Sequence, residues 1–582
     1  MSEPTRESGA PLLRIERLSL ALPEGADRLY AVDNVSYDLK AGEILCVVGE
    51  SGSGKSMTAN ALMGLLPSGV RVAQGRALFD GQDVLAMDEL SHRALRGRRI
   101  GMIFQEPMTA LNPLMRVGEQ IAEVFEAHGL LTPRARRERA LALLEEVRLP
   151  DPTSALRAYP FELSGGQRQR VMIAMALALE PELLIADEPT TALDVTTQAQ
   201  ILHLVKDLQA RRGMAVMFIT HDFGVVAEIA DRVCVMREGK IVEMGEAREV
   251  LDHPRHDYTR ALIDAIPADV VAAVGRPADA VAAVGRPADV MAAVERPGDA
   301  IPPPRDDTDS TPLLSVSGLD KIYRSSGGWF QPKREVVALD GIGFSLGKGE
   351  TLGIVGESGS GKSTLGRCIV GLNRPDSGEI RLDGVDLSTL EGRERRAHRR
   401  RIQMVFQDPY ASLNPRIRVG MAIAQGPIAN GVPKAEALAQ ARALLATVGL
   451  DGGAAERYPH EFSGGQRQRI GIARALALNP ELIVADEAVS ALDVSIQAQV
   501  LKLLDDLKQK LDLSLLFITH DLRVAAQICD RLIVMQKGRI VEHGSAREIF
   551  TSPQHPYTRE LLEAIPGRRE APAPATATAG VL

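Results

Sequence analysis

The sequence predicts an α/β protein of two repeated domains, each built on a mainly parallel β-sheet. Three observations support this prediction. In both halves, apolar runs such as residues 183–186 and 482–485 alternate with helix-like stretches, and such runs suit parallel strands covered on both faces. A glycine-rich loop follows a strand-like run twice, after residues 44–48 and after residues 351–355. Landmarks of the first half also recur in the same order in the second half, which indicates an internal duplication.

The segments outside the two domains have a biased composition. A ten-residue unit begins at Val271, repeats at Val281 and recurs less closely at Met291, with a proline in every copy. We therefore expect a flexible linker, with short helices broken at each proline as the alternative. The predicted organisation is a disordered N-terminus at 1–11, a first domain at 12–267, the linker at 268–311, a second domain at 312–567 and a disordered tail at 568–582.

Composition excludes some classes of function. The chain has 582 residues, a net charge of −8, 25% charged residues and 45% hydrophobic ones, the profile of soluble globular domains. The negative charge argues against a nucleic-acid partner bound by bulk positive charge. No apolar run approaches the ~20 residues of a membrane span, and the N-terminus lacks the apolar core of a signal peptide. We expect a cytosolic chain whose membrane role comes through a partner.

The four cysteines fit the same compartment. Cys46 and Cys234 lie in strand-like runs, Cys368 and Cys529 lie in helix-like stretches, and none forms a Cys-x-x-Cys pair. We expect small buried hydrophobic residues in a reducing compartment rather than disulfides or metal ligands.

Both glycine-rich loops fit the pattern G-x-x-x-x-G-K-[ST] of a phosphate-binding loop. The glycines let successive backbone N–H groups turn inward around phosphate oxygens, the lysine reaches the β/γ-phosphates and the serine hydroxyl ligates Mg²⁺. A glycine-rich surface turn is the alternative, but two matches that both follow a strand make it a poor one. The loops comprise Gly49, Glu50, Ser51, Gly52, Ser53, Gly54, Lys55 and Ser56, and then Gly356, Glu357, Ser358, Gly359, Ser360, Gly361, Lys362 and Ser363, followed by Thr364.

Polar residues follow the apolar runs at the points where catalysis needs them. Asp187 can hold Mg²⁺ through water, and Glu188 directly after it can orient and activate an attacking water. Gln105 offers a neutral amide to Mg²⁺ or the γ-phosphate, and His221 is a plausible γ-phosphate contact. Each residue alone would fit a solvated turn or a structural role, but every one recurs in the second half. The matching residues there are Asp486, Glu487, Gln407 and His520.

A Ser-Gly-Gly-Gln motif opens a long helix-like stretch in each half, running to about Leu179 in the first. Serine caps a helix start, and two glycines let a ligand approach the exposed N–H groups, which favour an anion. A capped helix without a ligand is the alternative for an isolated copy. The two signature motifs are Ser164, Gly165, Gly166 and Gln167, and Ser463, Gly464, Gly465 and Gln466.

These motifs together resemble a tandem ATP-binding-cassette ATPase, most closely the fused subunits of bacterial dipeptide, oligopeptide and glutathione importers. Two further elements resemble that branch. A Gln-x-Pro-x-x-x-Leu-Asn-Pro stretch occurs at 105–113 and 407–415, and a His-x-Tyr-Thr element begins at His256 and at His555. The resemblance covers about 12–267 and 312–567.

The resemblance implies that each cassette adds an antiparallel β subdomain and a helical signature subdomain to a mainly parallel sheet. It also implies that two cassettes pair head to tail, with each ATP between the phosphate loop of one and the signature motif of the other. Glu188, Glu487, His221 and His520 would then be catalytic. Ser56, Gln105, Ser363 and Gln407 would bind Mg²⁺, with Asp187 and Asp486 acting through water.

Some positions vary from the family pattern. Tyr323 fits the aromatic residue that stacks on adenine in the second half, whereas Leu22 stands at that place in the first half and Tyr30 lies further on. Phe462 replaces the leucine before the second signature motif, and the chain lacks the C-terminal cysteine cluster that some oligopeptide-branch ATPases carry. Asp194 and Asp493 match the loop that communicates between sites.

The implied partners are two integral-membrane permease subunits and an extracytoplasmic solute-binding protein, at the cytoplasmic face of a bacterial inner membrane, with no nucleic acid. Alternatives are a soluble tandem ATPase of the translation-factor type, or an importer of a non-peptide solute such as nickel. The proline-broken linker and the two histidines disfavour the translation-factor type. Basic runs at 93–99 and 395–401 fit a solvated face, or contact with permease or anionic headgroups.

Overall fold

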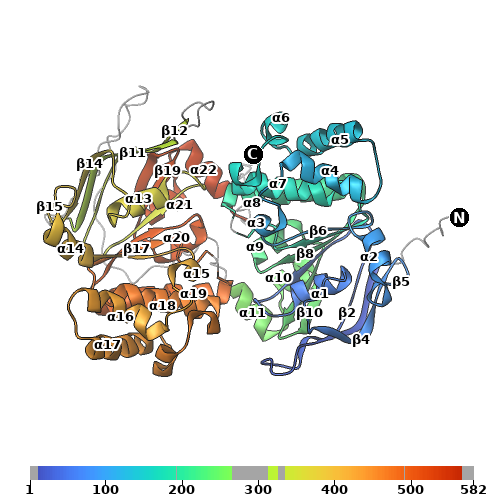
Figure 1. The fold of residues 1–582 in the computed structure, drawn as a ribbon, viewed down its shortest axis with the longest axis horizontal. Coiled ribbons are helices and arrows are strands. Elements are labelled where there is room, and N and C mark those ends of the chain that lie inside the picture. The colour runs from blue at the N-terminus through green and yellow to red at the C-terminus, as the bar shows by residue number, and fades with distance from the viewer. Residues whose placement is uncertain (1–10, 192, 265–311, 326–333, 491, 567–582) are drawn as a thin grey trace, which may run out of the picture. The chain divides into compact units, whose positions relative to one another are not determined.

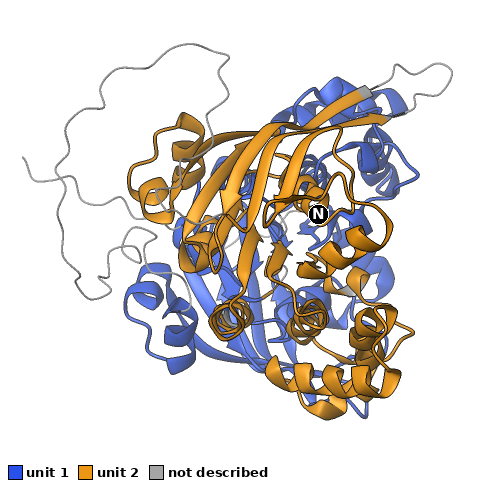
Figure 2. Cartoon of the chain, turned by 90° about the vertical axis from the view of Figure 1, so that its left-hand side faces the viewer, with its two compact units in different colours: residues 1–266, 493–495, 564–582 blue, residues 267–492, 496–563 orange. Residues whose placement is uncertain are grey.

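The computed structural model describes residues 11–191, 193–264, 312–325, 334–490 and 492–566. The chain divides into two compact units (Figure 2), which comprise residues 1–266, 493–495 and 564–582, and residues 267–492 and 496–563. The predicted linker at 268–311, the tail at 568–582 and nearly all of the predicted N-terminal segment at 1–11 lie outside the described residues.

The first unit contains two sheets (Figure 1). An antiparallel sheet has the strand order β2-β1-β4-β5, and a six-stranded sheet has the order β10-β9-β3-β8-β7-β6, in which only β10 pairs antiparallel to its neighbour. The strands are β1 (Leu13–Ala21), β2 (Tyr30–Leu39), β3 (Ile44–Val48), β4 (Arg71–Phe79), β5 (Gln82–Asp83), β6 (Ile100–Ile103), β7 (Leu183–Asp187), β8 (Ala215–Thr220), β9 (Arg232–Arg237) and β10 (Lys240–Glu246).

The central strand β3 explains why its sequence is continuously apolar. Ile44, Cys46 and Val48 pack in one hydrophobic core, while Leu45 and Val47 pack in a second core on the opposite face. Since side chains alternate along a strand, a strand buried on both faces needs apolar residues at every position. The expected buried parallel strand is confirmed.

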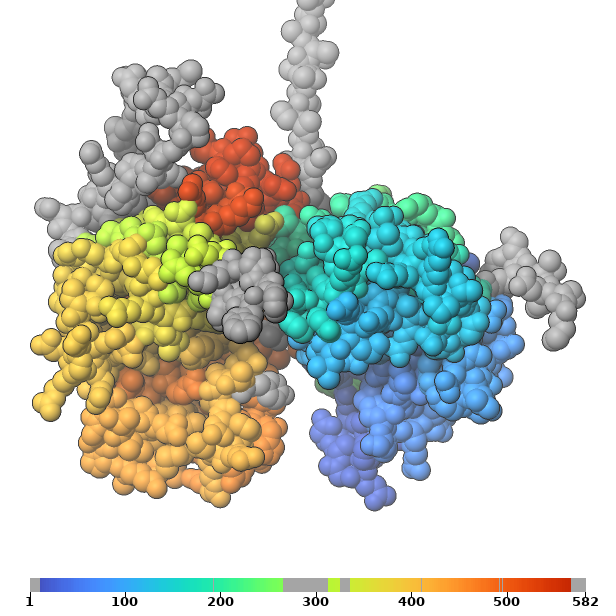
Figure 3. Space-filling model, turned by 45° about the horizontal axis from the view of Figure 1, so that its top comes forward, coloured from blue at the N-terminus to red at the C-terminus, as the bar shows by residue number. Residues whose placement is uncertain are grey.

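Helices cover the six-stranded sheet and form a separate helical region. Phe125 of α4, Leu143 of α5 and Val171 of α7 belong to one core cluster, so the amphipathic helices of this region pack together. Residues of this region form the cyan surface in Figure 3. The helices are α1 (Lys55–Leu62), α2 (Glu89–Leu95), α3 (Pro107–Ala110), α4 (Val117–Ala127), α5 (Pro133–Glu146), α6 (Pro152–Ala155), α7 (Gly165–Ala176), α8 (Val195–Arg212), α9 (Phe223–Ile229), α10 (Ala247–Asp252) and α11 (Asp257–Asp264), with 3₁₀ turns at Val84–Ala86 and Pro160–Glu162.

The second unit repeats this architecture with sheets ordered β12-β11-β14-β15 and β16-β17-β18-β13-β19-β20. Its strands are β11 (Leu314–Ser325), β12 (Arg334–Leu346), β13 (Thr351–Val355), β14 (Ser377–Leu382), β15 (Val385–Asp386), β16 (Ile402–Val405), β17 (Leu482–Asp486), β18 (Ser514–Ile518), β19 (Arg531–Gln536) and β20 (Arg539–Ser545). Its helices are α13 (Lys362–Ile369), α14 (Gly392–Arg401), α15 (Pro409–Ser412), α16 (Val419–Ala429), α17 (Lys434–Thr447), α18 (Gly464–Leu476), α19 (Val494–Leu511), α20 (Leu522–Ile528), α21 (Ala546–Thr551) and α22 (Pro556–Glu563), with 3₁₀ turns at Gly452–Glu456 and Pro459–Glu461.

Two local expectations need correction. Helix α7 ends at Ala176 rather than near Leu179, and the chain then passes through Glu180 in a left-handed conformation before Pro181. A residue that precedes proline is disfavoured in a helix, which explains the early end. Cys529 caps α20 instead of lying within it. All four cysteines are buried and free, as expected. Within the described ranges, no helix is long and apolar enough to cross a membrane.

Candidate nucleotide sites

The first phosphate loop connects β3 to α1 and depends on its glycines. Gly49 has φ 152° and Gly54 has φ 101°, a region that side chains rarely adopt. A Cβ atom on Gly54 would also lie 2.6 Å from the carbonyl oxygen of Ala31, and one on Gly49 would collide with the carbonyl of Met236. Packing and conformation therefore both require glycine, and the loop is a built structure rather than a loose surface turn.

Lys55 lies inside this loop, with only 4% of its surface exposed. Its Nζ donates hydrogen bonds to the carbonyl oxygens of Gly49 (2.6 Å) and Glu50 (2.9 Å). Burial lowers the pKa of Lys55, although the nearby Glu188 carboxylate opposes this effect. The loop thus holds a buried ammonium group that an incoming phosphate can attract, since anions bind where backbone N–H groups and a cation converge.

Ser56 and Asp187 form the predicted magnesium side of the site. The Ser56 hydroxyl donates to Asp187 Oδ1 at 2.9 Å. Burial raises the pKa of Asp187, while the Ser56 hydrogen bond opposes that shift. Hydroxyl, carboxylate and amide oxygens are the hard donors that Mg²⁺ prefers, and Mg²⁺ normally takes few protein ligands and completes its shell with water and phosphate. This donor set therefore fits Mg²⁺.

Glu188 follows β7 in a constrained backbone conformation, with φ 45°. Its Oε2 accepts hydrogen bonds from Gln105 Nε2 and Thr191 Oγ1, both at 3.0 Å, and lies 3.4 Å from His221 Nδ1. Non-glycine residues in this region cost free energy and cluster at functional sites. The structure therefore brings Gln105, Glu188 and His221 together at the carboxyl ends of three strands, as the sequence predicts.

The charges of this cluster are coupled. Burial would raise the pKa of Glu188, but the hydrogen bond and charge of His221 outweigh it and lower the value to about 2. Burial would lower the pKa of His221, yet the Glu188 carboxylate raises it above its ordinary value. The site therefore holds a carboxylate that remains ionised at neutral pH, which suits a group that orients or activates water.

The second unit builds the same site from its own residues. Lys362 Nζ donates to the carbonyl oxygens of Gly356 and Glu357, both at 2.7 Å, and Ser363 Oγ donates to Asp486 Oδ1 at 2.9 Å. Gln407 Nε2 donates to Glu487 Oε2 at 2.6 Å, and His520 Nδ1 lies 3.3 Å from Glu487 Oε1. Glu487 has φ 47°, and the carboxylate of Glu487 raises the pKa of His520 against the effect of burial.

The signature motifs open α7 and α18 with reciprocal caps. Ser164 Oγ accepts from the N–H of Gln167 (3.3 Å), whose Oε1 accepts from the N–H of Ser164 (2.9 Å). The predicted serine cap is confirmed, and the glutamine completes it, as the pattern Ser-x-x-Gln could have indicated. The equivalent bonds join Ser463 and Gln466 at 3.4 and 3.0 Å.

The two glycines of the first motif have different surroundings. A Cβ atom on Gly166 would lie 2.5 Å from Thr197 Cγ2 in α8, whereas one on Gly165 would meet its nearest atom at 3.9 Å. The second glycine is therefore required for helix packing, and the first leaves the helix start open to a ligand. The sequence prediction assigned both glycines to ligand approach and missed the packing role.

The remaining sequence candidates are two tyrosines, a helix-capping aspartate and the basic runs. Tyr323 of β11 and Tyr30 of β2 are partly exposed, at 42% and 38%. Asp194 caps α8 by accepting from the N–H of Thr197 at 2.9 Å. Several arginines of the basic runs have local structural partners: Arg99 pairs with Asp80 and Glu182, and Arg401 with Glu481 and Asp383. Part of each basic run is thus structural.

Comparisons with known proteins agree with this geometry. Residues 32–191 and 339–490 match the family model "ABC transporter", and residues 242–281 and 541–578 match the C-terminal region of oligopeptide/dipeptide transporters. The peptidoglycan transport ATP-binding protein YejF of Agrobacterium fabrum is 47% identical, with 95% of this chain and 96% of that protein covered. The glutathione import ATP-binding protein GsiA of Escherichia coli O157:H7 is 48% identical, with 95% and 89% covered.

A solved dimeric ATP-binding cassette with bound ADP and Pi is 30% identical and covers 40% of this chain and 99% of its own, with a TM-score of 0.37. Both cassettes contain the phosphate loop, the Asp-Glu pair and the Ser-Gly-Gly-Gln motif, and the family models match both halves. The chain therefore belongs to the ABC transporter ATPases, as a fused subunit of two cassettes that each carry the oligopeptide/dipeptide C-terminal region.

Proposed function

We propose that this chain powers the import of short peptides or glutathione across a bacterial inner membrane by hydrolysing ATP in both cassettes. The observation that carries the proposal is that each cassette combines the clustered glutamate and histidine with an oligopeptide-type C-terminal region. The chain is also 47% and 48% identical to ATP-binding proteins named for peptidoglycan transport and glutathione import. The solute is inferred from the C-terminal regions and the relatives alone, because the ATPase subunit does not itself bind it.

Each residue of the first cassette has a role in this proposal. Backbone N–H groups of the loop and Lys55 bind the β/γ-phosphates, and Glu188 holds the attacking water. When bound by Ser56, Gln105 and, through water, Asp187, Mg²⁺ neutralises charge that develops on the transferred phosphoryl group. His221 pairs with the Glu188 carboxylate before ATP binds and contacts the γ-phosphate once ATP is bound. Lys362, Glu487 and His520 act alike in the second cassette.

The two cassettes are proposed to act as a head-to-tail pair within one chain. Each ATP would lie between the phosphate loop of one cassette and the signature motif of the other, so that ATP favours closure and hydrolysis permits opening. The start of α7, where a Cβ atom on Gly165 would meet nothing nearer than 3.9 Å, supports a role in anion contact.

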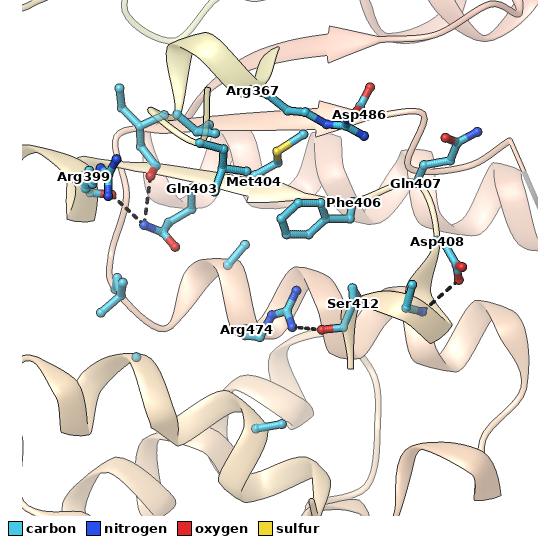
Figure 4. A pocket seen from close by; sticks show the side chains of 18 of the residues that line it. Arg367, Arg399, Gln403, Met404, Phe406, Gln407, Asp408, Ser412, Arg474 and Asp486 are labelled. Carbon is cyan, nitrogen blue, oxygen red and sulfur yellow. Dashed lines mark hydrogen bonds between the residues drawn. The ribbon is translucent and has the colours of Figure 1, made fainter. Parts of the chain in front are cut away.

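A cavity of about 720 Å³ beside Gln407 supports a docking role for permease subunits. Figure 4 shows Phe406, Gln407 and Arg474 around this cavity, and Arg474 donates to the carbonyl oxygen of Ser412. Gln407 also bonds Glu487, so a permease segment seated here would contact the residue that touches the catalytic carboxylate. We infer two permease subunits, an extracytoplasmic solute-binding protein and a peripheral position on the cytoplasmic face of the membrane.

Uptake by cells tests the proposal. A strain whose only copy carries Lys55→Ala and Lys362→Ala should lose uptake of labelled di- and tripeptides or of glutathione, since both loops lose their phosphate contact. Replacing an exposed basic residue such as Lys206, which lies on α8, serves as the matched control and should leave uptake intact. If peptide and glutathione uptake persist while another solute is excluded, the solute assignment is wrong; if no membrane permease co-purifies, the importer assignment is wrong.

A further inference from the structure

The C-terminal part of each cassette reaches back to the phosphate loop through a buried tyrosine. Tyr258, on α11, accepts a hydrogen bond from the backbone N–H of Glu50 at 3.2 Å (Figure 1 locates α11 and α1). Tyr557, on α22, accepts one from the N–H of Glu357 at 3.1 Å. Both tyrosines belong to the His-x-Tyr-Thr elements, which the hydrolytic mechanism does not use. Two copies of the same contact, from separate stretches of sequence, argue against an accident of side-chain placement.

Hydrogen bonds fix the backbone of the segment that carries the tyrosine. Glu243 of β10 accepts hydrogen bonds from the N–H groups of Arg255 (2.8 Å) and His256 (3.1 Å), which fixes the chain just before α11. His256 Nδ1 in turn accepts from the N–H of Tyr258 at 3.0 Å. In the second cassette, Glu542 accepts hydrogen bonds from the N–H groups of Gln554 and His555. His555 Nδ1 accepts one from the N–H of Tyr557.

Burial keeps the tyrosine hydroxyl in place as a neutral acceptor. Tyr258 is 8% exposed and Tyr557 is 4% exposed. The ring of Tyr258 also lies under the Arg237 guanidinium, 4.9 Å from the ring centroid, whereas Gln536 stands at the equivalent end of β19. The hydrogen bond from the loop N–H group to the tyrosine hydroxyl is the feature that both cassettes share.

The backbone of Glu50 is thereby held by hydrogen bonds at two points. Its N–H group donates to Tyr258, and its carbonyl oxygen accepts from Lys55 Nζ at 2.9 Å. A lysine that reaches toward a bound phosphate would weaken its hydrogen bonds to these carbonyl oxygens. The tyrosine bond would still hold the start of the loop while the later N–H groups surround the phosphates.

We propose that Tyr258 and Tyr557 are positioning residues that hold the phosphate loops in the conformation that binds ATP, so that the His-x-Tyr-Thr element sets nucleotide affinity. The inference rests on ATP binding at the phosphate loops, not on the identity of the solute. A purely structural role for the buried rings is the competing explanation. Replacement by phenylalanine separates the two, because it keeps the ring and removes the hydroxyl.

The test uses the purified full-length chain with Tyr258→Phe, Tyr557→Phe or both changes. A net hydrogen bond to a neutral acceptor predicts a loss of affinity of about 2- to 10-fold for a fluorescent ATP analogue in the double variant, with a similar rise in KM for ATP and kcat within about twofold of wild type. Thermal unfolding without nucleotide should change little. Tyr37→Phe is the matched control, because its buried hydroxyl donates to Met217 Sδ, away from the loop, and its affinity for ATP should equal that of wild type.

Unchanged affinity and KM in the double variant would overturn the inference, and so would a fall in unfolding temperature without a change in affinity, which is the result of a structural role alone. Because binding is measured on the isolated chain, failure to find a permease or a peptide solute would count against the importer proposal and leave this result unaffected.

Discussion

At the residue scale, the catalytic cluster depends on charges that burial would otherwise suppress. Glu188 is 8% exposed, yet His221 at 3.4 Å and donors from Gln105 and Thr191 keep it ionised. An unpaired buried carboxylate would instead take up a proton. The site therefore holds an ionised carboxylate beside a histidine whose pKa is raised.

The same pair predicts a pH-dependent stability. Glu188 has a lowered pKa, so its contribution is present above its unfolded value of about 4.3 and is lost as pH falls toward about 2. His221 has a raised pKa, so its contribution is full below about 6.5 and is lost as pH rises through the raised value. Without nucleotide, His221→Gln should lower Tm by roughly 2–4 °C per kcal/mol lost, most strongly between about pH 5 and 6.5 and less at higher pH.

Thermal scans from pH 5 to 8.5 check this pattern. His203→Gln is the control, because His203 is 68% exposed and 3.9 Å from its nearest carboxylate, and its Tm should follow that of wild type throughout. A Tm difference for His221→Gln that widens as pH rises would contradict the assigned charge pair.

At the element scale, the helix that starts at each signature motif is fixed by packing as well as by capping. Gly166 lies against Thr197 of α8, and Gly465 lies against Ile496 of α19, too close in both cases for a Cβ atom. Their neighbours Gly165 and Gly464 meet nothing nearer than 3.8 Å. Adjacent glycines of one motif therefore have separate functions, one in the contact between helices and one at the open helix start.

We predict that alanine at these two positions separates stability from activity. Gly166→Ala should destabilise the chain by about 1–3 kcal/mol, because the new methyl group overpacks the contact with Thr197. Thr197→Ser removes the obstructing methyl group and should restore most of the loss in the double variant. Gly165→Ala should unfold like wild type but hydrolyse ATP more slowly. Equal effects of the two alanines on Tm would show that the packing distinction is wrong.

How far the sequence predicts these elements depends on whether a motif and its partners are close along the chain. The phosphate loops, the strand-end carboxylates and the capped signature helices follow from local patterns, and parallel strands bring their carboxyl ends to one edge. Thr191 lies only three residues after Glu188, but nothing in the sequence indicates that this threonine donates to the carboxylate. The contact of Tyr258 with Glu50 joins residues more than 200 positions apart, and only the fold reveals it.

At the scale of the whole molecule, the duplication has kept both hydrolytic sets. Lys55, Glu188 and His221 have counterparts in Lys362, Glu487 and His520, and the distances within the two clusters agree closely. Neither cassette has lost the lysine, the glutamate or the histidine of this set. We therefore predict that both cassettes turn over ATP, rather than one acting as a silent nucleotide sensor.

Steady-state ATPase activity of the full-length protein with its permeases tests this claim most directly. Glu188→Gln and Glu487→Gln keep the size and polarity of the side chain but remove the charge that orients water, so each alone should lower kcat by roughly 10- to 1000-fold while ATP binding persists. Asp207→Asn, on the exposed face of α8, is the matched control and should hydrolyse ATP at the wild-type rate. Strong loss in both single variants is the predicted result; wild-type turnover in either one would show that its cassette is not a hydrolytic site.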